Sequence, residues 1–191
     1  MEDLIKKIKT RLHLRPEAEE FLYSISKEIK HSKGEVLIRE GQMVKKTFFV
    51  TSGCLRSFCI DNNGKEHTLL FAINDWWISD YIAIHNNELA TLTVECLTDS
   101  TVIEFNAKEL DGIHTRFPEF ESYQRLNLER HVVSLHKRIL NQLQLSATER
   151  YDLFLKQYPD IERHTRNYHI ASFLGITQES LSRIRVEKAK K

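Results

Sequence analysis

The sequence lacks the features that mark membrane, secreted and metal-binding proteins. No stretch approaches the roughly eighteen consecutive apolar residues of a membrane helix, and the start, MEDLIKKIKT, has no signal-peptide core. The three cysteines, Cys54, Cys59 and Cys96, form no CxxC pair. These absences predict a cytosolic protein with reduced thiols and no membrane segment.

Enzyme signatures are absent as well. The sequence contains no P-loop, no GxSxG, no dinucleotide fingerprint and no HExxH. There are nine histidines, but His131 and His136 are five residues apart, as are His164 and His169, and this spacing puts them on different faces of a helix. We therefore expect no metal and no cofactor, and a β-barrel enzyme has no catalytic constellation behind it.

The net charge is also low, at +1 for 191 residues. This value argues against a uniformly basic nucleic-acid-binding protein. The charge is unevenly distributed, however. Residues 163–191 hold two acidic residues, Glu179 and Glu187, and seven basic ones: Arg163, Arg166, Arg183, Arg185, Lys188, Lys190 and Lys191. A basic end on a near-neutral body is typical of a local phosphate-binding surface. For the last four residues alone, a solvated charged tail is the better explanation.

The first half of the chain changes from helical to β-rich patterning. Apolar spacing predicts a helix within residues 1–12 and a second, with Pro16 in its first turn, continuing over residues 17–29. Strands are predicted at residues 36–39, 47–51, 54–60, 67–72, 91–97 and 100–106, and Asn63-Gly64 is the strongest hairpin signal. Short strands with frequent turns indicate a sandwich or barrel.

A long helix is predicted from Pro118 to about residue 143. Leu128, Val132, Leu135 and Ile139 are spaced four, three and four residues apart, as in a coiled-coil seam. This pattern favours a dimer interface formed with a second copy of the chain. The alternative is a connecting helix that packs only on its own barrel.

The stretch Asn167–Arg185 has the pattern of a helix-turn-helix. Its apolar positions are Ile170, Leu174, Ile176, Leu181 and Ile184. Gly175 suits the tight turn, and Thr177 can cap the second helix. Ser146 and Glu149 form a capping-box pattern that starts the preceding helix. A helical hairpin that only packs is the alternative.

The second helix of this motif carries the candidate DNA-binding residues. They are Thr177, Gln178, Glu179, Ser182 and Arg183, to which we add Lys188 for phosphate. Arginine can read guanine, glutamine adenine and glutamate cytosine. We expect Arg183→Ala to relax sequence preference, and Lys188→Ala to weaken binding to all sequences alike.

A β-roll, a long helix and a terminal helix-turn-helix in this order resemble the Crp/Fnr family of bacterial transcription regulators. Two strings carry the resemblance: LIREGQMVKKTFFVTSGCLRSF is similar to the first half of the family's β-roll, and ATERYDLFLKQYP with IASFLGITQESLSRIR to its DNA-binding segment. The resemblance implies a homodimer on a palindromic site of double-stranded DNA. It also implies that Gln178, Glu179 and Arg183 read bases, with Thr177 and Ser182 beside them.

The sequence departs from the family pattern in two places. The run corresponding to the nucleotide pocket offers Trp77, Ser79, Asp80, Ala90 and Thr91 as effector-pocket residues. It has no arginine to pair with a buried phosphate, so control by cyclic AMP is not expected and any small-molecule effector is unknown. Only residues 186–191 follow Arg185, which is too few for the family's β-hairpin wing.

The sequence as a whole predicts an α+β protein. An antiparallel, jelly-roll-like β-roll with flanking helices occupies residues 1–117, a dimerisation helix residues 118–145, and a helix-turn-helix domain without a full wing residues 146–191. The predicted function is a dimeric cytoplasmic transcription regulator. The alternative is a ligand-binding regulatory module that acts through protein–protein contacts without DNA.

Overall fold

Two short helices precede the sheets. The structure is a computed structural model that describes residues 1–190, so Lys191 of the basic end lies outside the described residues. Helix α1 (Glu2–Lys9) buries Leu4, Ile5 and Ile8 against the roll. Helix α2 (Pro16–Ser24) begins at the expected proline.

The predicted helix over residues 17–29 is wrong in its second part. Helix α2 ends at Ser24, and β1 (Ser26–His31) pairs antiparallel with β8 (Ser100–Asn106), from Ser26 opposite Phe105 to His31 opposite Ser100. The apolar residues of this segment fit the periodicity of a helix as well as that of a strand. A partner strand far along the chain decides between them, because strand formation depends on cross-strand packing more than on intrinsic preference.

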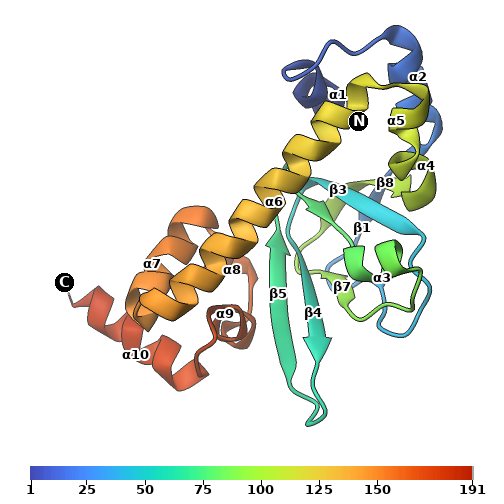
Figure 1. The fold of residues 1–191 in the computed structure, drawn as a ribbon. Coiled ribbons are helices and arrows are strands. Elements are labelled where there is room, and N and C mark those ends of the chain that lie inside the picture. The colour runs from blue at the N-terminus through green and yellow to red at the C-terminus, as the bar shows by residue number, and fades with distance from the viewer. Residues whose placement is uncertain (191) are drawn as a thin grey trace.

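The β-roll consists of two facing antiparallel sheets (Figure 1). Their strand orders are β1-β8-β3-β6 and β2-β7-β4-β5. The remaining strands are β2 (Val36–Ile38), β3 (Lys46–Ser52), β4 (Leu55–Ile60), β5 (Glu66–Ala72), β6 (Trp77–Ile78) and β7 (Thr93–Cys96). The predicted α+β class and antiparallel β-roll are confirmed, whereas β1 and β6 were not predicted as strands.

Apolar side chains fill the space between the two sheets. They come from both sheets and from the loop before β7: Ile38, Phe48, Val50, Leu55, Ala72, Ile78, Ala90, Val94, Cys96 and Val102. Removing this apolar surface from water is the main favourable term that holds the sheets together. The middle of the roll is therefore a packed core.

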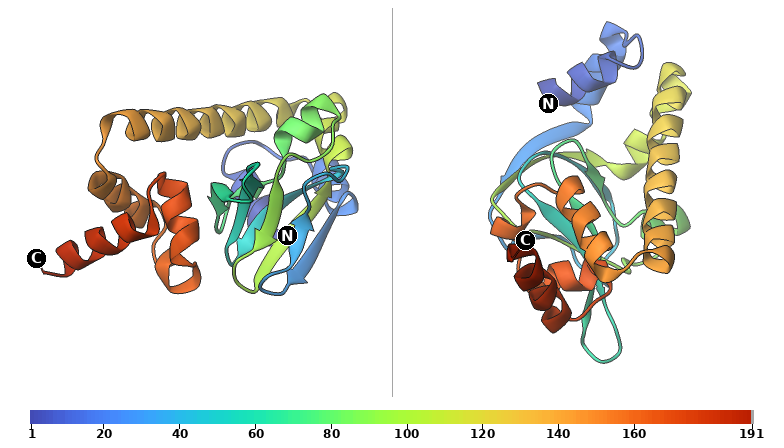
Figure 2. Two further views of the ribbon diagram at one scale, coloured as in Figure 1. Left: turned by 90° about the horizontal axis from the view of Figure 1, so that it is seen from below. Right: turned by 90° about the vertical axis from the view of Figure 1, so that its left-hand side faces the viewer.

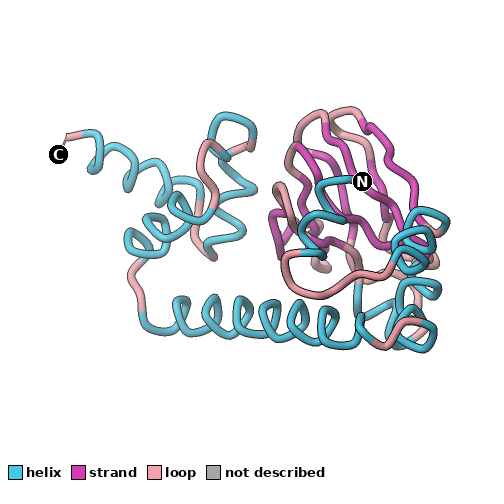
Figure 3. The backbone as a smooth tube through the Cα atoms, turned by 90° about the horizontal axis from the view of Figure 1, so that it is seen from above, coloured by secondary structure: helices cyan, strands magenta, loops and turns pink. Residues whose placement is uncertain are grey.

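One long helix connects the roll to the C-terminal helices (Figure 2, Figure 3). After α3 (Tyr81–Asn86), α4 (Ala107–Asp111) and α5 (Ile113–Arg116), helix α6 (Glu119–Gln144) passes along the roll. At its far end lie α7 (Ala147–Gln157), α8 (Ile161–His164), α9 (Asn167–Leu174) and α10 (Gln178–Ala189). Within residues 1–190 no strand follows α10.

The C-terminal helices share a hydrophobic core with the outer surface of the roll. The ring of Phe71 on β5 lies 5.9 Å from Phe154, 5.8 Å from Tyr158 and 5.1 Å from Phe173, between centroids. Trp76 adds a contact of 5.8 Å to Tyr158. Because of this shared core, the division of the chain at residues 118 and 146 stays a prediction.

A charged cluster lies beside this aromatic core. Arg56 on β4 is 1% exposed, and its guanidinium donates from Nε to Glu95 and from Nη2 to Glu66, each at 2.6 Å. His169 on α9 is 4% exposed, and its Nε2 lies 3.9 Å from a Glu66 carboxylate oxygen. Within residues 1–190 neither ring nitrogen of His169 has a hydrogen-bond partner. The α9 contact therefore places a histidine next to a buried arginine.

This histidine is expected to make stability depend on pH. Burial, together with the charges of Arg56 and Arg166, lowers the pKa of His169 to about 3. The unfolded imidazole has a pKa of about 6.5, so at lower pH the unfolded state binds a proton that the folded state does not. The free energy of unfolding should therefore fall as the pH drops below about 6.5, by up to about 1.4 kcal/mol per pH unit from this group.

Urea unfolding at pH 7.5 and pH 5 measures this effect. The wild type should lose more stability between the two values than His169→Gln does. The exposed His164 on α8 provides a matched control, and His164→Gln should behave as the wild type. Equal losses in wild type and His169→Gln would contradict the assignment.

Candidate DNA-binding surface

Hydrogen bonds from side chains fix the starts of α7 and α10. The Ser146 hydroxyl accepts from the Glu149 N–H at 3.3 Å, and the Glu149 carboxylate accepts from the Ser146 N–H at 2.8 Å. This is the expected capping box. The Thr177 hydroxyl accepts from the Ser180 N–H at 3.2 Å and caps α10. Both helices thus begin where the sequence predicted.

The turn between α9 and α10 has the backbone that a helix-turn-helix requires. Gly175 adopts φ +68°, in the left-handed region where other residues are strained. Its N–H donates to Ser172 O at 3.1 Å, and the Ile176 N–H donates to Ala171 O at 3.0 Å. These bonds cap α9 and redirect the chain within residues 175–177, which fixes the start of α10 against α9.

Helix α10 has one buried side and one exposed side. Leu181 is fully buried and Ile184 is 7% exposed, and both belong to the core shared with α7 and α9. The predicted contact residues Thr177, Gln178, Glu179, Ser182 and Arg183 are all exposed. Positions 179, 182, 183 and 186 follow the spacing of one helix face. This face presents a carboxylate, a hydroxyl and a guanidinium together.

The two charged groups on this face are available for hydrogen bonds. The pKa of Glu179 is lowered by a hydrogen bond from its own backbone N–H, by one from Thr177 and by the charge of Arg183. Its carboxylate is therefore an acceptor at neutral pH. The Arg183 guanidinium is exposed, and Nη2 makes one long bond of 3.4 Å to the Ser180 hydroxyl. Such a fork can reach two acceptors on one guanine.

Arg185, the other arginine of α10, has a structural role that the sequence pattern did not indicate. Its Nε donates to the Tyr151 hydroxyl at 3.1 Å, and Nη1 donates to Asn167 Oδ1 at 2.6 Å. A third contact is an ion pair with Glu162. The guanidinium thus ties α10 to α7, α8 and α9, and it holds the exposed face at a fixed angle.

Lys188 lies on the opposite side of α10 from the predicted base-reading residues. It follows Leu181 by seven residues and Ile184 by four, so it lies on the same side of the helix as these two buried residues. Its ammonium pairs with Asp152 on α7 and lies 5.9 Å from the centroid of the Tyr151 ring. Lys190, seven residues after Arg183, lies instead on the exposed face. Helical spacing alone could have shown this difference.

Helix α6 carries an exposed apolar strip. Leu128 is 63% exposed, Val132 40%, Leu135 36% and Ile139 56%. Val133, Leu140 and Leu143 extend it. Seven exposed apolar side chains along one helix are uncommon on a protein that acts as a monomer.

The predicted effector residue Asp80 is occupied by contacts within the chain. It is fully buried, and its carboxylate accepts from the N–H groups of Ala83 at 3.1 Å, Thr91 at 2.7 Å and Leu92 at 2.9 Å. The Thr91 hydroxyl adds a fourth bond at 2.9 Å. Asp80 therefore caps α3 and holds the loop before β7.

The other predicted effector residues do not converge on one space. The Trp77 ring packs on Phe49 and Phe105, at 5.2 and 5.4 Å between centroids, as part of the contact with the N-terminal helices. The Ser79 hydroxyl donates to Lys46 O at 2.8 Å. Ala90 is 4% exposed and belongs to the packed core of the roll.

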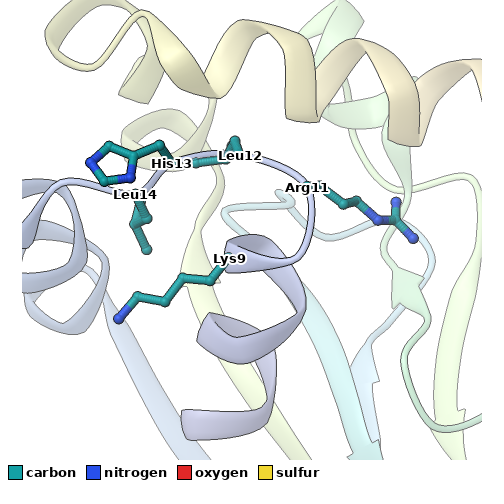
Figure 4. A pocket seen from close by; sticks show the side chains of 5 residues that line it. All are labelled: Lys9, Arg11, Leu12, His13 and Leu14. Carbon is teal, nitrogen blue, oxygen red and sulfur yellow. The ribbon is translucent and has the colours of Figure 1, made fainter.

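A shallow depression in the α1–α2 connection is lined by Lys9, Arg11, Leu12, His13 and Leu14, and Lys9 and Arg11 point in different directions (Figure 4). Among residues 1–190, no three His, Cys, Asp or Glu side chains are grouped to hold a metal ion. No helix in this range has the length and hydropathy of a membrane crossing.

Comparison with known proteins places this geometry in context. The sequence model of the cyclic nucleotide-binding domain family matches residues 28–116. FixK2 from Bradyrhizobium japonicum has the same fold, with a TM-score of 0.74 at 16% identity, over 87% of this chain and 85% of that one. A protein from Eubacterium rectale, described as a regulator of the Crp/Fnr family, gives a TM-score of 0.73 at 18% identity, over 93% and 85%.

A sequence relative agrees with these likenesses. The transcriptional activator protein FnrA of Stutzerimonas stutzeri is 23% identical over 163 residues, which are 80% of this chain and 66% of that protein. The chain shares its fold with FixK2 and the Eubacterium rectale regulator, and its residues 28–116 match the cyclic nucleotide-binding domain family. The chain spans just under two thirds of the length of FnrA.

The residues of this chain do not fit a cyclic nucleotide in the roll. No lysine or arginine occurs between Glu66 and Ala107, so this segment supplies no cationic partner for a phosphate bound near Asp80. The buried Arg56 lies between the roll and α9, near Tyr168, and is held by Glu66 and Glu95. The Asp80 oxygens that would accept from a ribose are already bonded.

Proposed function

We propose that this protein is a homodimeric transcription regulator of the Crp/Fnr type that reads a palindromic site in double-stranded DNA with helix α10. The observation that carries the proposal is the exposed face of α10, on which Gln178, Glu179, Ser182 and Arg183 lie together while Leu181 and Ile184 hold the helix in place. Side chains of these types form direct hydrogen bonds with base edges in the major groove. Val186, 55% exposed on the same face, suits contact with a thymine methyl group.

Pairing of two copies along α6 supplies the two-fold symmetry of the site. Leu128, Val132, Leu135 and Ile139 would meet the same residues of the second copy, which removes their exposed apolar surface from water. Each protomer then presents one recognition helix. The two half-sites are expected roughly one helical turn of DNA apart, about 34–36 Å.

Control of this activity does not use cyclic AMP. The missing cation and the bonded carboxylate of Asp80 both oppose a cyclic nucleotide in the roll. Any effector of another class would need a site other than Trp77, Ser79, Asp80, Ala90 and Thr91, because these side chains are bonded or packed within the chain. We place the protein in the cytoplasm, where such regulators meet DNA.

Salt dependence of duplex binding tests the proposal against its alternative. A DNA-binding protein loses affinity for random duplex steeply as salt rises, because bound phosphates release their counterions. A regulatory module that acts only through protein contacts shows no such slope. Binding of the full chain to a random-sequence duplex at several salt concentrations therefore separates the two functions.

Two lysines near the end of α10 give a matched comparison. Lys190→Ala should reduce the slope of log affinity against log salt by about one, since it removes one phosphate contact. Lys188→Ala should leave that slope unchanged and lower thermal stability slightly, because Lys188 pairs with Asp152. Fluorescence anisotropy titrations provide the slopes. A reduced slope for Lys188→Ala alone would show that the assignment of the two lysines is reversed.

A further inference from the structure

Three elements meet at the edge of the roll. Strand β5 is the last strand of its sheet, so part of its backbone is not paired with another strand. On that side it meets α6 and α9. The contacts there are polar and directional, in contrast to the aromatic core next to them.

Arg138 makes the contact from α6. Its guanidinium donates from Nη1 to the Leu69 carbonyl and from Nη2 to the Thr68 carbonyl, the latter at 3.4 Å. The same group lies 4.5 Å from the centroid of the Phe173 ring on α9. Burial lowers the pKa of Arg138, which reflects how far the group is removed from water. One side chain of the dimerisation helix thus touches both the roll and the first helix of the helix-turn-helix.

Ser172 makes the contact from α9. Its hydroxyl accepts from the Thr68 N–H at 2.8 Å and donates to the Glu66 carbonyl at 3.0 Å. The backbone of Thr68 is therefore bonded to α9 through its N–H and to α6 through its carbonyl. Thr68 itself is 3% exposed. These bonds fix the position of α9 along β5. Apolar contacts alone would not fix this position, because they are non-directional.

The turn before the recognition helix also lies against α6. A side chain at Gly175 would come within 3.5 Å of the Gln142 amide nitrogen, so the turn and the last part of α6 are neighbours. The covalent link between α6 and α7 is short and extended at Leu145 and Ser146. Rotation about this link would swing α10 away from α6 unless the contacts on β5 hold it.

We propose that Arg138 and Ser172 are positioning residues that set the distance between the two recognition helices of the dimer, and so the half-site spacing that it accepts. This inference rests on the proposed function. In the sequence, Arg138 lies between Leu135 and Ile139 of the exposed apolar strip on α6. Its bonds to Thr68 and Leu69 therefore link the proposed dimer interface to β5. Ser172 then ties β5 to the helix-turn-helix. The same two links in both protomers define one separation of the α10 helices.

Selection from a spacer library tests the inference. The duplexes carry two copies of the half-site that the wild type selects, separated by spacers of varied length. The wild type should retain a narrow range of spacers. Arg138→Ala and Ser172→Ala should each reduce the preference for the best spacer on the order of tenfold, a typical coupling between linked sites. Preference within a single half-site should not change, because neither residue lies on the exposed face of α10.

Matched controls separate positioning from a general loss of structure. Arg125→Ala removes an arginine on the same helix whose guanidinium, among residues 1–190, bonds only to Glu129 one turn along. This variant should select spacers as the wild type does. Arg138→Lys keeps a cationic nitrogen that can donate to the carbonyls, so it should recover part of the spacer preference. If Arg138→Ala does not fold, as judged by circular dichroism, Ser172→Ala carries the test from the α9 side.

Each result has one meaning. Broadened spacing with unchanged half-site preference supports the inference. Wild-type spacing in Ser172→Ala and in folded Arg138→Ala overturns it while leaving the proposed function intact. A wild type that enriches no palindrome overturns the proposed function, and the inference falls with it.

Discussion

The double variant Leu128→Glu, Ile139→Glu is expected to be a monomer that binds its palindromic site on the order of 10²–10⁴-fold more weakly than the wild type. The two side chains are 63% and 56% exposed in the single chain, so the protomer should fold as before. In a dimer they would be buried, and two opposed carboxylates in an apolar seam repel each other. Loss of the dimer removes the gain from binding two half-sites at once.

Sedimentation velocity gives the mass, and titration of a palindromic duplex gives the affinity. Lys137→Glu is the control, because Lys137 is exposed on the side of α6 opposite Leu128, Val132, Leu135 and Ile139, and its charge change of −2 equals that of the double variant. It should remain dimeric. A double variant that keeps the dimer mass would show that α6 is not the interface and that its apolar strip serves another contact.

Arg183→Ala is expected to cost on the order of 1–3 kcal/mol at the cognate site and to relax base preference at one position of each half-site. The guanidinium is exposed, so thermal stability should not change. Arg183→Lys keeps the charge but loses the planar fork. It should therefore retain the salt slope of the wild type while losing much of its base preference.

Binding to the selected site and to single-base variants of it measures both quantities. Arg185→Ala serves as the contrasting variant, since Arg185 bonds to Tyr151, Asn167 and Glu162 within the protein. Arg185→Ala should lower thermal stability and weaken binding to all DNA sequences by a similar factor. Unchanged base preference in Arg183→Ala would remove α10 from the role of recognition helix.

The helix-turn-helix could be predicted from the sequence because its determinants are local. Gly175, Thr177 and the capping box of Ser146 and Glu149 act within one turn of chain, and the structure places each as expected. The α10 face follows from helical spacing. The same rule, applied to Lys188, would have placed it beside Leu181 and Ile184 rather than toward DNA.

The features that the sequence did not indicate depend on distant partners. Strand β1 exists because β8 pairs with it, and its own residues equally suit a helix. The role of Asp80 depends on the N–H groups of Thr91 and Leu92, whose approach is set by the fold. Docking of α9 on β5 rests on Ser172 and Arg138, single polar residues in unremarkable helical runs.

Selection of bound sequences from a random duplex library, by the purified full chain without added ligand, determines whether the protein reads a palindrome. A dimeric reader predicts an enriched palindrome whose half-sites lie roughly one helical turn apart. Repetition with a small-molecule extract of cells covers a required effector. No enriched palindrome under either condition would contradict the account and favour a regulatory module that acts without DNA.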